Sequence, residues 1–242
     1  MLTVKEVYEA IDAFAPFASQ ESWDNSGLLV GGMAQPADRI LTTLDISEAI
    51  VAQAVAEQVQ LVVAHHPVIF SPLKTLPPDS PVYQLAAHGI AAICVHTPLD
   101  MAPLGLNTFA HTLLEKPLAL QGTQEVLEPS WTDGRGFGWI DTSARTWTPQ
   151  TLAQTLQTAF GEVRYSAAER SIRKIAYCSG SAASMLELAA AKGCDALITG
   201  DIKHDRWYAA EFAGIALFDC GHYGTERFAA GIMARSEERR VG

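Results

Sequence analysis

The sequence has no hydrophobic run long enough to span a membrane, and its first residues, MLTVKEVYEA, lack the apolar core of a signal peptide. Positive charge is scarce, since 17 Lys and Arg stand against 27 Asp and Glu and give a formal net charge of -10. Such a chain lacks the basic surface that non-specific nucleic-acid binding requires. We therefore expect a cytoplasmic protein with neither a membrane nor a nucleic acid as its partner.

Cysteine is scarce as well. The four cysteines, Cys94, Cys178, Cys194 and Cys220, form no CxxC pair, which argues against a cysteine-rich structural zinc site. Three of them adjoin apolar strand-like runs, where a free thiol behaves as a small hydrophobe. Cys220 lies two residues before His222, and we interpret it as a core residue rather than a ligand. This cysteine usage indicates a reducing compartment.

The chain does contain a regular alternation of predicted strands and helices. Its 242 residues, 48% of them hydrophobic, can build the core of one large domain or two small ones. Apolar residues at helical spacing follow Thr3, and Glu6 completes a capping box, so the chain is predicted to begin with a helix. The next predicted elements are strand 40–44, helix 47–57, strand 60–64, helix 81–88 and strand 90–95. This order predicts a largely parallel sheet covered by helices.

The second half of the chain repeats this pattern after a middle stretch, 122–171, in which we place the domain division. A helix is predicted over 149–160 and again over 182–193 and 205–214, with strands beginning near Lys174, Cys194 and Ile215. Asp45 and His65 are 65 − 45 = 20 positions apart, and Ser179 and Gly200 are 200 − 179 = 21 apart. The predicted fold class is therefore α/β: two similar three-layer subdomains from an internal duplication, with mainly parallel sheets, over residues 1–125 and 126–242.

Polar clusters follow the predicted strands. The buried run Leu61-Val62-Val63-Ala64 ends in His65 and His66, two imidazoles that are costly to bury unless their lone pairs are used. One interpretation is a polar strand end that reaches water, and the other is a metal or catalytic site. Ligands bind beyond the carboxyl ends of parallel strands, and the other polar clusters are predicted at such ends, which favours a site.

Eight side chains of metal-ligand type occur in these clusters: His65, His66, His96, Asp100, Asp201, His204, His222 and Glu226. Neighbouring residues that leave a strand point to opposite faces, so His65 and His66 are expected to face different ions. Imidazole and carboxylate without thiolate favour Zn, Mn, Fe or Co. His96 is the candidate catalytic residue, for proton transfer or for orienting a ligand, on a loop that also carries Asp100.

Five motifs together, WDNSGLLVG, AHHPVIFSPLKTL, HTPLD, TGDIKH and GHYGTE, resemble those of the Nif-three-like dinuclear metal proteins, often described as GTP cyclohydrolase I type 2 homologues. The resemblance runs from about Val4 to Ala234. It implies two α/β subdomains, a two-metal site between them and a ring-shaped homohexamer. It also implies two divalent ions per chain, bound by His65, His66, Asp100, His222 and Glu226.

Two other motifs allow alternative interpretations. WDNSG is either an Asx-type turn with Trp23 in the core or, as the resemblance favours, part of the lining of the site. CSGSAAS lies at a strand-to-helix junction, where backbone N–H groups either hold an anion or serve ordinary packing, and we favour packing. TGDIKHDRW departs from the usual pattern of the family, so His204 is left out of the metal set.

The predicted function is that of a metal-dependent hydrolase with a small-molecule substrate. Opening of a guanine ring and hydrolysis of a nucleotide or another phosphoester are both compatible with this ligand set. The alternative is a non-catalytic metal-binding scaffold or adaptor protein, because the same ligands can hold metal ions in an enzyme and in a protein without activity.

Overall fold

A computed structural model describes residues 2–166 and 169–241. Its contacts divide the chain into two compact units. Unit 1 comprises the chain up to Gly105 and again from Phe228, and unit 2 comprises Leu106–Arg227. The division predicted from the sequence, at residue 125, lies later in the chain than the end of unit 1 at Gly105, and it assigns the last helix to the second domain. The domain bounds 1–125 and 126–242 stay a prediction.

Unit 1 contains a four-stranded sheet with the order β1-β4-β3-β2. The strands are β1 (Gly27–Val30), β2 (Ile40–Thr43), β3 (Leu61–Ala64) and β4 (Ala91–Cys94). β2, β3 and β4 are parallel, and β1 pairs antiparallel with β4 at one edge. Every residue of β3 and β4 is buried, as expected for central parallel strands covered on both faces.

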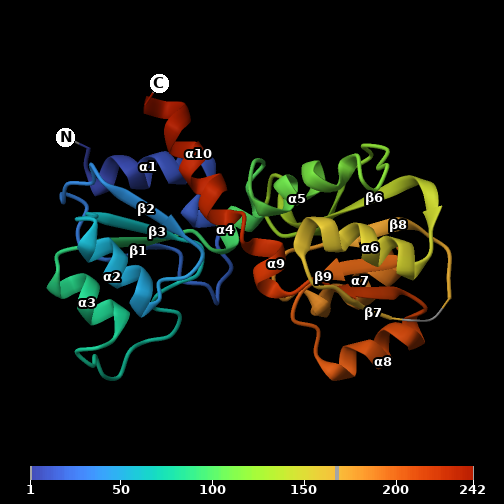
Figure 1. Ribbon diagram of the computed structural model, residues 1–242. Helices are drawn as coiled ribbons and strands as arrows, with labels where there is room; N and C mark the ends of the chain where they lie inside the picture. The colour runs from blue at the N-terminus through green and yellow to red at the C-terminus, as the bar shows by residue number, and fades with distance from the viewer. Residues whose placement is uncertain (1, 167–168, 242) are drawn as a thin grey trace. The chain divides into compact units, whose positions relative to one another are not determined.

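Helices cover both faces of this sheet (Figure 1). The helices of one face are α2 (Glu48–Ala56) and α3 (Pro81–Ala87), and those of the other are α1 (Val4–Phe14) and α10 (Ala229–Val241). Val51 of α2 and Leu85 of α3 pack with Val62 of β3 in one buried cluster. The capping box predicted at Thr3 and Glu6 is confirmed at the start of α1.

Unit 2 contains a six-stranded mixed sheet with the order β5-β6-β8-β9-β10-β7. The strands are β5 (Glu125–Pro129), β6 (Gly136–Trp147), β7 (Arg164–Tyr165), β8 (Ile172–Tyr177), β9 (Ala196–Thr199) and β10 (Ala216–Asp219). β8, β9 and β10 are parallel, whereas the β5–β6, β6–β8 and β7–β10 pairs are antiparallel. The predicted parallel strands thus form the centre of the sheet, and the middle stretch of the chain adds antiparallel strands at its sides.

Helices cover both faces of this sheet too (Figure 1). α7 (Leu186–Ala191) and α8 (His204–Ala213) lie on one face, and α5 (Leu106–Glu115) and α6 (Pro149–Phe160) lie on the other. Leu186 of α7 and Ala210 of α8 pack with Leu197 of β9 in a buried cluster. The helix predicted over 149–160 is confirmed with these bounds. The α/β class is therefore confirmed for both units.

The two units share one strand order. In unit 1 the elements follow one another along the chain as α1-β1-β2-α2-β3-α3-β4, and the strands lie in the sheet in the order β1-β4-β3-β2. In unit 2 the corresponding elements are α6-β7-β8-α7-β9-α8-β10, and their strands lie in the order β7-β10-β9-β8. The strand that ends before His65 and the strand that ends before Gly200 hold equivalent places. A common origin of the two halves by duplication stays a prediction, and this topology supports it.

Two predicted loops are short helices instead. HTPLD begins α4 (Thr97–Met101) and HYGTE forms α9 (His222–Glu226). Each of these helices has five residues, about one and a half helical turns. Among the described residues, no helix is long and apolar enough to cross a membrane.

Candidate metal centre

The end of β3 supplies two histidines with defined ring orientations. His65 is fully buried, and its Nδ1 donates a hydrogen bond of 2.9 Å to the carbonyl of Val95. Because a carbonyl oxygen can only accept, the hydrogen is on Nδ1 and the lone pair is on Nε2. His66 Nδ1 lies 2.7 Å from Asp45 Oδ1, a carboxylate that follows the neighbouring strand β2. Both rings therefore present Nε2 as their ligand atom.

His96 follows β4 and is held in the same way by a buried aspartate. Its Nδ1 lies 2.8 Å from Asp24 Oδ1, and the other carboxylate oxygen accepts from the backbone N–H and hydroxyl of Thr97 and from the hydroxyl of Ser26. Burial alone would raise the pKa of Asp24, but the hydrogen bonds from His96 and Thr97 hold it well below its ordinary value. Asp24 is therefore a carboxylate that fixes His96.

These histidines form one cluster within unit 1. His65, His66 and His96 each bring one ring nitrogen within 4.8 Å of the other two. His96 occupies the N-cap position of α4, and the buried Asp100 lies in the first turn of that helix. Unit 1 thus supplies three imidazoles and a carboxylate at the carboxyl ends of β3 and β4.

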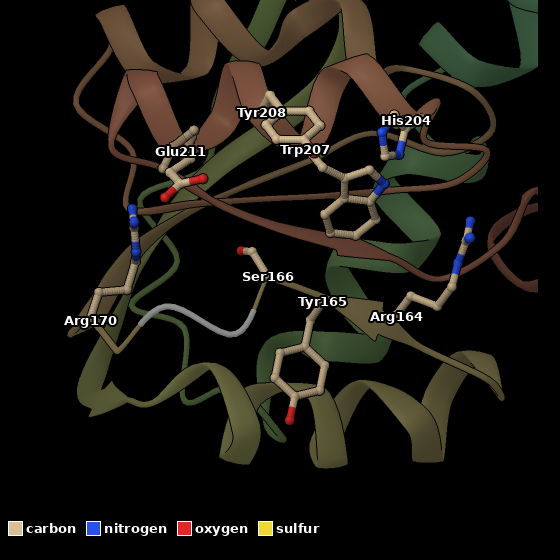
Figure 2. A pocket seen from close by; sticks show the side chains of 9 residues that line it. Arg164, Tyr165, Ser166, Arg170, His204, Trp207, Tyr208 and Glu211 are labelled. Carbon is tan, nitrogen blue, oxygen red and sulfur yellow. The ribbon is translucent and has the colours of Figure 1, made fainter.

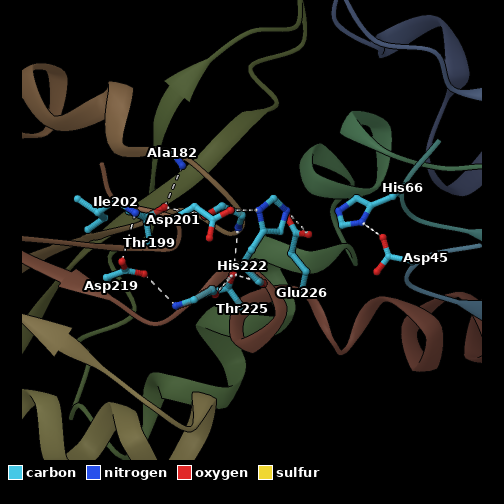
Figure 3. A network of polar contacts seen from close by, with 12 residues as sticks. Asp45, His66, Ala182, Thr199, Asp201, Ile202, Asp219, His222, Thr225 and Glu226 are labelled. Carbon is cyan, nitrogen blue, oxygen red and sulfur yellow. Dashed lines mark hydrogen bonds and ion pairs between the residues drawn. The ribbon is translucent and has the colours of Figure 1, made fainter. Parts of the chain in front are cut away.

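Unit 2 supplies a second histidine–carboxylate cluster, on α9. His222 Nδ1 lies 2.8 Å from Asp201 Oδ2, and its Nε2 lies 2.9 Å from Glu226 Oε2, one helical turn along (Figure 3). The hydrogen bond with Glu226, with a smaller contribution from Asp201, raises the pKa of His222 to about 9. Glu226 is 3% exposed, so its carboxylate is buried beside this imidazole.

The backbone around His222 is shaped to hold these groups. Asp201 has a φ of 50°, a left-handed conformation that a non-glycine residue adopts at a cost, and its carboxylate reaches His222 from there. Gly180 has a φ of 65°, and a Cβ added to it would collide with Glu226 Oε1 and lie 3.5 Å from His222 Nε2. A Cβ on Gly200 would lie 2.7 Å from the backbone nitrogen of His222. Glycine is thus required where β9 and the CSGS turn approach α9.

Three backbone amides of the CSGSAAS segment donate to side chains of the protein, which supports the packing interpretation favoured from the sequence. Ser179 N–H donates to Asn107 Oδ1 and Gly180 N–H donates to Thr225 Oγ1. Ala182 N–H donates to Thr199 Oγ1 (Figure 3). Since these N–H groups already donate to protein side chains, the segment offers them to no anion. The segment instead ties β8 to α9.

Three further residues from the sequence predictions lie outside the proposed ligand set. His204 is exposed at the start of α8 and lines a separate cavity of about 530 Å³ with Trp207 and Arg170 (Figure 2). Trp23 is 57% exposed, so the interpretation that places it in the core is wrong. Cys220 is buried in the core as predicted, and burial raises the pKa of its thiol far above the ordinary value.

A common arrangement links the four candidate histidines, since each uses Nδ1 for an acceptor and presents Nε2 to its cluster. Metal-binding histidines typically have such a partner, which sets the tautomer and raises the basicity of the ligand nitrogen. The clusters therefore fit divalent metal ions. Sequence reasoning did not assign Asp24 or Asp45 to the site and left Asp201 unassigned. Asp45 and Asp201 each precede their histidine by 21 positions and follow the adjacent parallel strand, a pattern that identifies both.

The fold and these clusters define an α/β protein with histidine–carboxylate groups at the carboxyl ends of parallel strands. The model of the Duf34/NIF3 (NGG1p interacting factor 3) family matches residues 2–240, and the chain belongs to this family.

Comparisons with individual proteins agree. The chain is 35% identical over 241 residues to a Helicobacter pylori protein named GTP cyclohydrolase 1 type 2, covering 97% of this chain and 91% of that one. It is 27% identical over 248 residues to a Clostridium acetobutylicum protein named GTP cyclohydrolase 1 type 2 homolog, covering 98% and 90%. A Bacillus cereus protein related to NIF3 has the same fold, with a TM-score of 0.87, 18% identity and coverage of 100% and 93%.

Proposed function

We propose that this protein is a metal-dependent hydrolase that binds two divalent ions per chain, of Zn, Mn, Fe or Co. The proposed ligands are His65, His66 and Asp100 from unit 1, and His222 and Glu226 from unit 2. This set combines imidazole and carboxylate, the ligands that such ions accept.

The observation that carries the proposal is the orientation of the histidine rings. Of the three proposed ligand histidines, His66 and His222 donate Nδ1–H to an aspartate, and His65 donates to a backbone carbonyl. A histidine that merely ends a strand in water needs no acceptor on its second nitrogen, whereas metal-binding histidines typically have one. The pattern supports ligand histidines held for metal binding.

Two ions held by these residues would supply a water molecule of lowered pKa and polarisation of the bond to be cleaved. The residues of the chain have separate roles. Asp45, Asp24 and Asp201 orient the imidazoles. His96, whose ring contacts those of both His65 and His66, is the candidate catalytic residue for proton transfer.

The name of the Helicobacter pylori relative supports a nucleotide substrate. Hydrolytic opening of a guanine ring and hydrolysis of a phosphoester both require an activated water and charge stabilisation, and we propose a reaction of this class. We further propose a cytoplasmic homohexamer, on the family resemblance.

Elemental analysis after metal loading and mild dialysis tests the ligand set. The wild type is expected to retain two ions per chain, and His65→Ala and His66→Ala are each expected to lose mainly one. Glu226→Ala is expected to weaken both. His204→Ala is the matched control, because His204 lines a different cavity. A single ion in the loaded wild type, or two ions held tightly by Glu226→Ala, contradicts this ligand set.

A turnover screen with the metal-loaded protein tests the enzyme itself, over nucleotides and phosphoesters. Turnover in the wild type and its loss in Asp100→Asn are expected. If the protein holds two ions and turns over none of these compounds, the result favours the non-catalytic scaffold.

A further inference from the structure

Two aromatic side chains in unit 1 are exposed to solvent beside the histidine cluster. Trp23 is 57% exposed and Phe70 is 53% exposed. Their ring centroids are 6.2 Å apart, with the planes inclined by 43°. Together they form an apolar surface, called here the aromatic platform. Exposing an indole and a phenyl ring to water forgoes the stabilisation that burial of either would give.

The aromatic platform is held in place by the turn that carries Trp23. Asp24 accepts hydrogen bonds from His96, Thr97 and Ser26, which fixes the turn to the end of β4. Asn25 Nδ2 donates to the carbonyl of Ile69 at 2.5 Å, which ties this turn to the loop that carries Phe70. The two rings therefore belong to two loops joined by hydrogen bonds.

The platform is continuous with the proposed metal cluster. The centroid of the His96 ring lies 5.9 Å from that of Trp23 and 6.3 Å from that of Phe70, with interplanar angles of 75° and 79°. His96 in turn shares the cluster with His65 and His66. A ligand on the platform would thus place its polar part beside three imidazoles.

We propose that the aromatic platform binds a planar heteroaromatic ring of the substrate, such as a purine. This inference rests on the proposed function and names its substrate class. A ring inserted between two others needs about 7 Å between them, that is, two contacts of about 3.5 Å. The two centroids are 6.2 Å apart and the planes are inclined, so a substrate ring does not fit between them and stacks on an exposed ring face instead. Stacking on aromatic side chains suits any base, because every base has a π-face.

Equilibrium binding of two probes by the metal-loaded protein tests this inference. GMP carries a purine and a phosphate, whereas ribose 5-phosphate carries the phosphate and sugar alone. Trp23→Ala and Phe70→Ala are each expected to weaken GMP binding about 5- to 150-fold, the range for loss of one stacking partner, and to leave ribose 5-phosphate unchanged. Trp23→Phe is expected to restore most of the affinity for GMP. Phe212→Ala is the matched control, since Phe212 is 99% exposed in unit 2.

Several outcomes overturn the inference. In one, the wild type binds GMP no more tightly than ribose 5-phosphate. In a second, both probes weaken equally in Trp23→Ala. In a third, the substitution leaves GMP binding unchanged and alters the mass of the assembly, which would assign the platform to contact between copies. Metal content is measured in every variant, so a failure of the platform with two ions retained is distinct from a failure of the metal site.

Discussion

Gly180 lies against the Glu226 carboxylate, so a methyl group added to its Cα would collide with Glu226 Oε1. Gly180→Ala is expected to displace the carboxylate and to reduce metal affinity about 10- to 100-fold, the range seen when a ligand loses its support. Competition with a chromogenic chelator measures this affinity.

Gly193→Ala is the control for Gly180→Ala. Gly193 has a φ of 71°, close to the 65° of Gly180, but a Cβ there meets no atom within 4 Å. Both variants share the cost of a left-handed alanine, about 1–2 kcal/mol of unfolding free energy. Only Gly180→Ala is expected to lose metal, and equal affinity in the two variants would contradict the role given to Glu226.

Asp201 orients His222 from a left-handed backbone conformation. Asp201→Asn keeps an oxygen that can accept from Nδ1–H but removes the charge, and Asp201→Ala removes both. We expect metal affinity to fall modestly in the first variant and about 10- to 100-fold in the second. Isothermal titration with Zn²⁺ or Mn²⁺ measures the change. Asp205→Ala, an exposed aspartate on α8, is the control and should bind as the wild type does.

At the scale of elements, a buried pair ties α5 to the sheet of unit 2. His111 Nε2 lies 2.9 Å from Asp141 Oδ2, and the carboxylate also accepts from Thr123 and from the backbone of Gly122. Burial alone would raise the pKa of Asp141, but the hydrogen bonds from His111, Thr142 and Thr123 hold it below its ordinary value. The carboxylate therefore stabilises the fold in its ionised form.

Asp141→Asn is expected to lower the free energy of unfolding by about 1–3 kcal/mol at neutral pH, because buried donors lose a charged acceptor. The folded pKa lies below the unfolded value, so this stabilisation is present above the unfolded pKa and disappears as the pH falls through the folded one. Urea unfolding at several pH values measures it. A difference from the wild type that stays constant down to pH 2 would contradict the ionised role.

At the scale of the whole molecule, a ligand that binds only the folded chain stabilises it. At a free metal concentration of about 100 times Kd, the gain is about 2.7 kcal/mol for one site, which corresponds to a rise in Tm of about 5–10 °C. The protein is proposed to bind two ions, so chelator treatment of the loaded wild type should lower Tm by at least that amount. The same treatment should change Tm little in Glu226→Ala, and an unchanged Tm in the wild type would contradict metal binding by the folded state.

Assembly is predicted from the family resemblance alone. Light scattering coupled to size exclusion should give a mass of about six chains over a broad concentration range. A monomer throughout that range would contradict the homohexamer.

Much of the fold could be predicted from the sequence because its elements follow local rules. The helix at Pro149–Phe160 follows from a Thr148 cap, a proline in the first turn and apolar spacing, and the structure has the same bounds. Parallel strands such as β3 are short apolar runs between helices. The short helices α4 and α9 were expected as loops, because five residues carry too little periodicity to show a helix.

The sequence by itself determined which residue types follow the parallel strands, and so placed His65, His66, His96 and His222 at strand ends. Only the tertiary structure decided the partners of their rings. The hydrogen bond of Asp24 with His96 spans 72 positions, and that of Asp45 with His66 spans 21. Strand ends far apart in the chain become neighbours only when the sheet forms, so neither the tautomers of the histidines nor the exposure of Trp23 follows from local sequence.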